Sequence, residues 1–156
     1  MIRVCVIDDE EYGAEIVRAA FGDKDNVEIN EGFSQKADIT VYLSSGDNLF
    51  RNIKYGSVII FSENRRIVTD VAVRAVMCGL YDKATVTASS IGISEDKLEF
   101  VYCMQRSLST LEGIPVDIGE LRVRSDWLCL EKVLAAVTAR IIAFGDIEDR
   151  IELIKR

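Results

Sequence analysis

The sequence predicts an α/β protein with a mostly parallel, Rossmann-like sheet, helices on both faces and an antiparallel β extension at one edge. Two observations predict this class. In the first half of the chain, short β-branched apolar runs alternate with stretches of helical periodicity, as βα units around a parallel sheet do. After Gly79, polar and apolar residues alternate instead, which is typical of antiparallel strands with one solvated face.

The first half supplies the parallel strands. Ile2–Ile7 is a continuous apolar run and is expected to be a strand buried on both faces. A helix from about Glu11 to near Gly22 follows from the spacing of its apolar residues. The remaining expected elements are strands at Val27–Ile29, Ala37–Leu43 and Ser57–Phe61, a short helix over Leu49–Ile53, and a helix from Arg65 to about Val73.

The second half supplies the antiparallel extension and the longest helix. Ala75–Cys78 can continue the preceding helix or form a strand, and its β-branched neighbours and Gly79 favour the strand. Three alternating stretches follow, ATVTASSI, KLEFVYCMQRSLSTL and PVDIGELRV, with Glu112-Gly113 as a hairpin turn between two of them. The last expected elements are a helix over Leu128–Phe144, with Asp126 as N-cap and Gly145 as C-cap, and a short closing helix over Ile147–Ile154.

Composition bounds the class of protein. The 156 residues form most naturally one domain, 1–156, and the single proline argues against a long linker. The formal charge of −7, without a cluster of Lys and Arg, argues against binding to nucleic acid or to an anionic membrane. No apolar run is long enough to span a bilayer, and the N-terminus lacks the pattern of a leader, so a cytoplasmic location is expected.

Residue types exclude further chemistry. The chain has no histidine, which removes Ser-His and Cys-His nucleophile pairs and nearly every common zinc or iron site. The four cysteines, Cys5, Cys78, Cys103 and Cys129, lie far apart in apolar runs and are expected to be small buried residues in a reducing compartment. We therefore expect no metal centre and no cofactor.

Four acids, Asp8-Asp9-Glu10-Glu11, follow the first strand, where an α/β protein usually has its ligand site. A phosphate loop needs several glycines and a lysine, whereas this turn has only Gly13 and four carboxylates that would repel phosphate. The favoured interpretation is a solvated helix start whose acids complement the positive end of the helix, so that neutralising Asp8 and Asp9 would cost less than about 1 kcal/mol. The functional alternative is a divalent cation bound by Asp8, Asp9 and Glu10.

The strand that ends in Asp8-Asp9 also resembles the start of a response-regulator receiver. That resemblance implies paired acids that hold Mg²⁺ beside a phosphoryl-accepting aspartate. At the end of the third strand, however, Leu43-Ser44-Ser45 stands where the acceptor is expected, and Asp47 comes too late. Ser62 can match the hydroxyl at the end of the fourth strand, and no strand matches the one that carries the lysine.

A second resemblance covers roughly residues 37–152. Gly79–Ile91 (GLYDKATVTASSI) resembles a segment of the central domain of the Mur ligases, ATP-dependent enzymes that add amino acids to the peptidoglycan precursor. ADITVYL, NLFRNIKYGSVIIFSEN and LEKVLAAVTARIIAFGDIEDRI resemble other segments of that domain and occur in the same order. The resemblance implies the fold of the central domain and a link to bacterial cell-wall synthesis.

Departures from the Mur pattern fall on its catalytic residues. Asp8–Tyr12 stands where the family has its Gly-Lys-Thr/Ser phosphate loop, Ser44–Asp47 stands at its Asp-His, and Ser62–Asn64 stands at its Asn-Ala-Asp-Asp. The family's C-terminal ligase domain has no counterpart. The resemblance therefore carries over the fold and none of the catalytic residues, so we expect a degenerate relative without ligase activity.

Arg106 is the remaining candidate, because a guanidinium after a strand can bind a carboxylate or phosphate. A solvated sheet face explains it equally well. The leading hypothesis is a non-catalytic binding or regulatory module whose partner is another protein or a small anionic metabolite, with a homodimer left open. The alternatives are a receiver-like module that senses phosphorylation or metal through Asp8 and Asp9, and an enzyme that uses carboxylates and Arg106.

Overall fold

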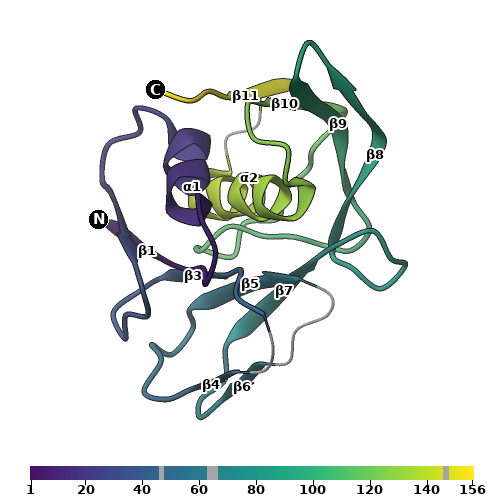
Figure 1. The fold of residues 1–156 in the computed structure, drawn as a ribbon. Helices are drawn as coiled ribbons and strands as arrows, with labels where there is room; N and C mark the ends of the chain where they lie inside the picture. Colours follow the sequence, from purple (N-terminus) through teal and green to yellow (C-terminus); the bar gives the residue numbers. More distant parts are fainter. Residues whose placement is uncertain (46–47, 63–66, 146–147) are drawn as a thin grey trace.

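The fold is a nine-stranded mixed sheet curled around one helix (Figure 1). The computed structural model describes residues 1–45, 48–62, 67–145 and 148–156. The strands are β1 Ile2–Ile7, β2 Val27–Glu31, β3 Ile39–Tyr42, β4 Asn48–Phe50, β5 Val58–Ser62, β6 Ile67–Thr69, β7 Arg74–Cys78, β8 Val86–Ser94, β9 Lys97–Met104, β10 Leu121–Ser125 and β11 Arg150–Leu153. The helices are α1 Gly13–Phe21 and α2 Leu130–Phe144.

The sheet has the order β11-β10-β9-β8-β7-β5-β3-β1-β2. Strands β2, β1, β3, β5 and β7 are parallel, β8 and β10 run antiparallel to β9, and β11 is parallel to β10. The predicted α/β class, the mostly parallel sheet and the antiparallel extension are therefore confirmed. The predicted strand at Ala75–Cys78 is confirmed as β7.

A β-bulge lets the sheet curl. In β8, Ser89 pairs with Val101 and Gly92 with Glu99, so that two residues of β8 lie opposite one residue of β9. One of the two, Ser90, has a left-handed backbone with φ 52°. Bulges of this kind bend a strand and increase its twist. Figure 1 shows the result, with β5 and β7 on one side of α2 and β10 and β11 on the other.

The two helices lie on the same face of the sheet. Alternate residues of β5 separate the two faces: Val58 and Ile60 belong to the core that contains both helices, whereas Ile59 and Phe61 belong to a second cluster with Phe50. The small parallel sheet β4-β6 accompanies this second cluster. Helices on both faces, as a Rossmann-like sheet has them, are thus not confirmed in the described part of the chain.

Three predicted helices are wrong where the structure describes them. The expected helix over Leu49–Ile53 contains strand β4, the expected helix from Arg65 to about Val73 contains strand β6, and the expected closing helix contains strand β11. In β11, Ile151 and Leu153 are buried while Arg150 and Glu152 are exposed, which is the period of a strand. Arg65, Arg66, Asp47 and Ile147 lie outside the described residues.

Helix α2 is the centre of the core. Ten of its residues are buried, because strands surround it on several sides and α1 packs against it. It ends as predicted at Gly145, whose left-handed backbone donates its N–H to Ile141 O at 2.7 Å. The predicted N-cap is wrong: the N-cap is Cys129, and Asp126 accepts instead from Lys97 and from the backbone N–H of Lys155.

Candidate functional site

The acid turn lies at the point where the strand order of the parallel part of the sheet reverses. Across the sheet the five strands of this part lie in the order β2-β1-β3-β5-β7, which is 2-1-3-4-5 when they are renumbered along the chain. The chain therefore passes from β1 to β2 on one side, and from β3 through β5 to β7 on the other side. Ligands of open α/β sheets bind beyond the carboxyl ends of the strands at such a point. Asp8 and Asp9 follow β1 there, and Leu43–Ser45 follows β3.

Asp8 is bound by a lysine from the other half of the chain. Lys132 Nζ lies 2.9 Å from Asp8 Oδ2, donates to Glu11 O at 2.8 Å, and is 3.4 Å from Glu10 Oε2. The side chains of Lys132 and Asp8 are only 9% and 7% exposed. An ammonium group has three N–H donors, and these three oxygens match them. Lys132 therefore neutralises the Asp8 carboxylate from within the protein.

Burial and ion pairing act on Lys132 in opposite directions. Burial lowers the pKa of its ammonium group, but the hydrogen bond and charge of Asp8, followed by those of Glu10, outweigh burial and leave the pKa above its ordinary value of 10.5. Lys132 is thus charged at neutral pH. Its positive charge balances the negative charge of Asp8.

The other acids of the turn have separate roles. Asp9 Oδ2 accepts from the hydroxyl and the backbone N–H of Ser45 at 2.9 and 3.3 Å, which links the carboxyl ends of β1 and β3. The backbone N–H of Glu10 donates to Asp8 Oδ1 at 3.0 Å and closes a local turn. The carboxylates of Glu10 and Glu11 are exposed. The four acids therefore do not converge on one point.

The predicted helix start is partly wrong. Helix α1 begins at Gly13 with Tyr12 as N-cap, so the four acids precede its first turn, and Glu15 is the acidic residue within that turn. Asp8 is not solvated, because it is buried against Lys132. The low cost expected for neutralising Asp8 is therefore revised upward, since that change would leave the Lys132 charge without its partner.

Backbone geometry around Gly13 fixes the turn. A Cβ atom at Gly13 would lie 2.4 Å from Asp8 Oδ2, so this glycine is needed for the approach of the helix start to the carboxylate. Next to it, Tyr12 has a left-handed backbone with φ 76°. For a bulky residue without glycine's freedom this conformation is unfavourable. Tyr12 is 53% exposed.

Arg106 does not join the acid turn. It lies after β9, beside the beginning of β8, and its Nε donates to Lys83 O at 3.3 Å. Four strand spacings of about 4.8 Å separate β8 from β1 along the sheet, so Arg106 and Asp8 cannot hold one small ligand. Anion binding at Arg106 remains a separate prediction.

An open groove adjoins the acid turn, and we call it the Trp127 groove. It consists of two hollows of about 630 and 610 Å³ that share Tyr12, Trp127 and Lys155. The first hollow extends toward the acid turn and is also lined by Glu10, Glu11, Asp96, Leu128 and Cys129, and the second extends along α1 to Ile154. Lys155 Nζ lies 5.8 Å from the centroid of the Trp127 ring.

Sequence reasoning missed this groove. Its residues come from the turn before α1, the β8–β9 turn, the segment before α2 and the segment after β11. Only the curl of the sheet brings these four segments together. The one local signal was the apolar Trp127-Leu128 pair directly before the helix, and this cannot be told from a core segment by pattern alone.

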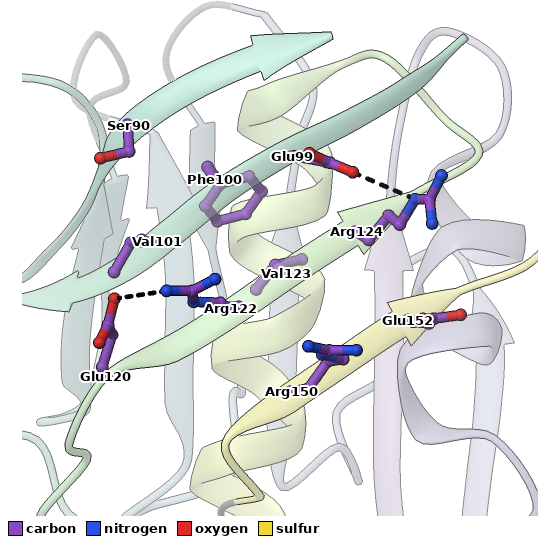
Figure 2. A pocket seen from close by; sticks show the side chains of 10 residues that line it. All are labelled: Ser90, Glu99, Phe100, Val101, Glu120, Arg122, Val123, Arg124, Arg150 and Glu152. Carbon is purple, nitrogen blue, oxygen red and sulfur yellow. Dashed lines mark hydrogen bonds and ion pairs between the residues drawn. The ribbon is translucent and has the colours of Figure 1, made fainter. Parts of the chain in front are cut away.

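A further hollow, of about 390 Å³, lies on the outer face of β9, β10 and β11 (Figure 2). Three arginines and three glutamates line it, namely Arg122, Arg124, Arg150, Glu99, Glu120 and Glu152. Arg124 Nε is 3.3 Å from Glu99, and Arg122 is 3.4 Å from Glu120. Since the charges balance, this face is explained by ion pairs on a solvated sheet, one of them, Arg124–Glu99, across the strands β10 and β9.

Comparison with known proteins and a search for metal-binding groups give no assignment. Neither the protein-family models nor the curated proteins contain a match to this sequence. Within the residues that the structure describes, no group of three or more Cys, Asp or Glu side chains is arranged to hold a metal ion. Neither helix of the described chain, α1 or α2, has the length and apolarity needed to cross a membrane.

Proposed function

We propose that this protein is a non-catalytic binding or regulatory module whose partner surface is the Trp127 groove. The observation that carries the proposal is the position of Lys132. Its ammonium group binds Asp8 and the carbonyl of Glu11 in the turn after β1, so the Asp8 carboxylate is already neutralised. A metal or a phosphoryl group would have to displace a buried ion pair, which is costly.

The relation to the Mur ligase central domain is part of this proposal. It rests on the ordered resemblance of motifs over residues 37–152, and the strand at β7, which the resemblance requires, supports it. The link to bacterial cell-wall synthesis and the cytoplasmic location rest on the resemblance and on the sequence alone. Without a phosphate loop, nothing in the described chain positions a transferring phosphoryl group in that family's way.

The test of the proposal is a coupled assay of phosphate release with ATP, Mg²⁺ and UDP-muramyl precursors. We expect no turnover above background. The control is Asp9→Asn, which leaves the Asp8–Lys132 pair intact. Turnover in the native protein that Asp9→Asn abolishes would overturn the non-catalytic proposal and assign a nucleotide site to the acid turn.

A receiver-like module is the second candidate. The 2-1-3-4-5 order of the parallel strands, which receivers share, favours it, as does the presence of a lysine beside Asp8. Labelling with acetyl phosphate and Mg²⁺ separates the two candidates. We expect no labelling, because Leu43–Ser45 supplies no acceptor carboxylate at the end of β3. Incorporation of acid-labile phosphate would favour the receiver.

A further inference from the structure

Three large apolar side chains lie in solvent around the Trp127 groove. Tyr12, Leu128 and Ile154 are 53%, 52% and 53% exposed, and they come from three separate segments of the chain. Single exposed apolar residues are ordinary, but apolar residues gathered around one hollow mark an interaction surface. Trp127 lines both hollows and is itself buried, with 7% of the residue exposed.

One of these side chains, Tyr12, lies on a backbone conformation that is unfavourable for tyrosine. Tyr12 keeps a left-handed backbone at φ 76°, and its carbonyl accepts the N–H of Ile16 at 2.9 Å, which makes it part of the start of α1. Glycine or asparagine fits this conformation better than tyrosine does. An aromatic ring kept at a strained position and exposed beside a groove is explained by a contact that the ring makes with a partner.

The charge of the first hollow indicates the chemistry of that partner. Glu11 and Asp96 line it, are exposed, and have no ion pair among the described residues. Lys132 in the same hollow is already neutralised by Asp8, and Asp126 is neutralised by Lys97. The second hollow carries one acid, Glu15, beside three bases, Arg18, Lys155 and Arg156, so its lining is net positive. The acidic end of the groove is therefore the end at the acid turn.

We infer that the Trp127 groove docks a cationic amphipathic segment of a partner protein. Its Lys or Arg side chains lie at Glu11 and Asp96, and its apolar side chains contact Leu128, Tyr12 and Ile154. The inference rests on the proposed function and names its partner class. Two adjoining hollows of about 600 Å³ each suit a chain segment that runs along α1 better than a compact metabolite.

The test uses a fluorescein-labelled peptide of about 14 residues, made of Leu and Lys at helical spacing, and a matched peptide with Glu in place of Lys. Fluorescence anisotropy should show binding of the Lys peptide and none of the Glu peptide. The double variant Leu128→Ser with Ile154→Ser should weaken binding about tenfold or more, because it removes two half-exposed apolar side chains that would be buried against the Leu side chains of the peptide. Glu11→Lys with Asp96→Lys should weaken it similarly and reduce its salt dependence.

Matched variants away from the groove decide whether binding is local. Ile91→Ser with Ile93→Ser removes equally exposed apolar residues from the end of β8, and Glu112→Lys with Asp117→Lys makes the same change in net charge elsewhere. Both should leave the affinity unchanged. If these control variants weakened binding equally, the overall charge of −7 rather than the groove would explain it, and the inference would be overturned.

Two further outcomes assign the groove to another occupant. A concentration-dependent dimer in sedimentation that Leu128→Ser with Ile154→Ser converts to a monomer would show that a second copy covers the groove. Spermidine that displaces the peptide and saturates at one site would indicate a small organic cation. Absence of peptide binding together with absence of ATP turnover would overturn the docking inference and leave the non-catalytic proposal standing.

Discussion

Lys132 performs at the residue level what a bound cation performs in many acid pockets. It comes from the first turn of α2 and reaches the turn after β1, 124 positions earlier in the chain. Placing a lysine near the beginning of a helix is unfavourable with respect to the helix dipole, and the burial of its side chain adds to the cost. The two oxygens it contacts at hydrogen-bonding distance, on Asp8 and Glu11, offset both costs.

Lys132→Met should destabilise the protein by about 3–5 kcal/mol, because it leaves the buried Asp8 carboxylate without a partner. Combining it with Asp8→Asn removes the uncompensated charge and should recover more than half of the loss. Urea unfolding of the two variants measures the difference. A single variant that is no less stable than the double variant would show that the pair contributes little.

The same pair predicts a dependence of stability on alkaline pH. Because the folded-state pKa of Lys132 lies above its ordinary value of 10.5, the contribution of the pair is complete below about pH 10.5 and is lost as the pH rises through the higher folded value. The difference in unfolding free energy between the native protein and Lys132→Met should therefore be constant near neutral pH and shrink in strong alkali.

Asp126 fixes the segment after β11 beside the groove by accepting a hydrogen bond from the backbone of Lys155. Hydrogen bonds from Lys97 and then from the backbone N–H of Lys155 lower the pKa of its carboxyl group below the ordinary value of 3.8. Its stabilising contribution is therefore present above about pH 3.8 and is lost as the pH falls through the lower folded value.

Asp126→Asn should release the segment around Lys155 at neutral pH at a cost of about 1 kcal/mol or less, since the ion pair is partly solvated. Trp127, the one tryptophan of the chain, reports this change through its fluorescence because Lys155 lies over its ring. In the native protein a similar change should occur on acidification below pH 3.8. An acid transition of the same size in Asp126→Asn would assign it to another carboxyl group.

At the element scale, the turn into α1 depends on Tyr12. Replacing it by Asn or by Val removes the ring in both cases, but only Asn tolerates the left-handed backbone. Tyr12→Asn should therefore be more stable than Tyr12→Val by about 1–2 kcal/mol, as measured by urea unfolding. Equal stabilities would mean that the turn relaxes to an ordinary backbone when the ring is absent.

Elements with a long and clear pattern were predicted correctly from the sequence. The strand Ile2–Ile7 is a continuous apolar run, whereas the long helix up to Phe144 and the alternating strand β9 each repeat one period over many residues. The errors fall on short segments. In the segment that contains β11, the spacing of Ile147, Ile151 and Ile154 fits a helix, and only the pairing of β11 with β10 makes it a strand.

The prediction of helices on both faces of the sheet, which is not confirmed in the described part of the chain, has the same origin. The three β-branched residues of β6 favour a strand, but a run this short is decided by whether a partner strand is present, and here β6 pairs with β4. Tertiary contacts decide such cases. They are also what place Lys132 beside Asp8, which no spacing in the sequence indicates.

At the scale of the whole molecule, the location of the candidate site was predictable and its chemistry was not. Acids after the first strand of an α/β protein indicate the carboxyl end of the sheet, and the structure places Asp8 and Asp9 there. The ion pair that neutralises Asp8 and the groove beside it arise from the fold of the second half of the chain around α2. The same sequence pattern is therefore compatible with a metal pocket, a receiver and the arrangement observed.

Because the sheet curls, helix α1 contacts both of its ends. This helix packs against β1 and β2 at one end of the sheet and against β11 at the other, and Arg140 of α2 donates to Ala20 O at 3.2 Å. The antiparallel extension consequently shares one core with the parallel strands. A single apolar cluster contains residues from β1, β5, β9, β10, both helices and β11.

This continuity predicts that residues 1–156 unfold as one domain. Fluorescence of Trp127, which lies before α2 beside the end of the chain, and far-ultraviolet circular dichroism, which averages over all elements, should give the same urea midpoint and the same slope. Lys132→Met should shift both midpoints together, because the ion pair it removes connects the β1 turn to α2. Two separated transitions would instead divide the chain, with the parallel strands and the antiparallel extension unfolding independently, and α1 would then be a contact between two units rather than part of one core.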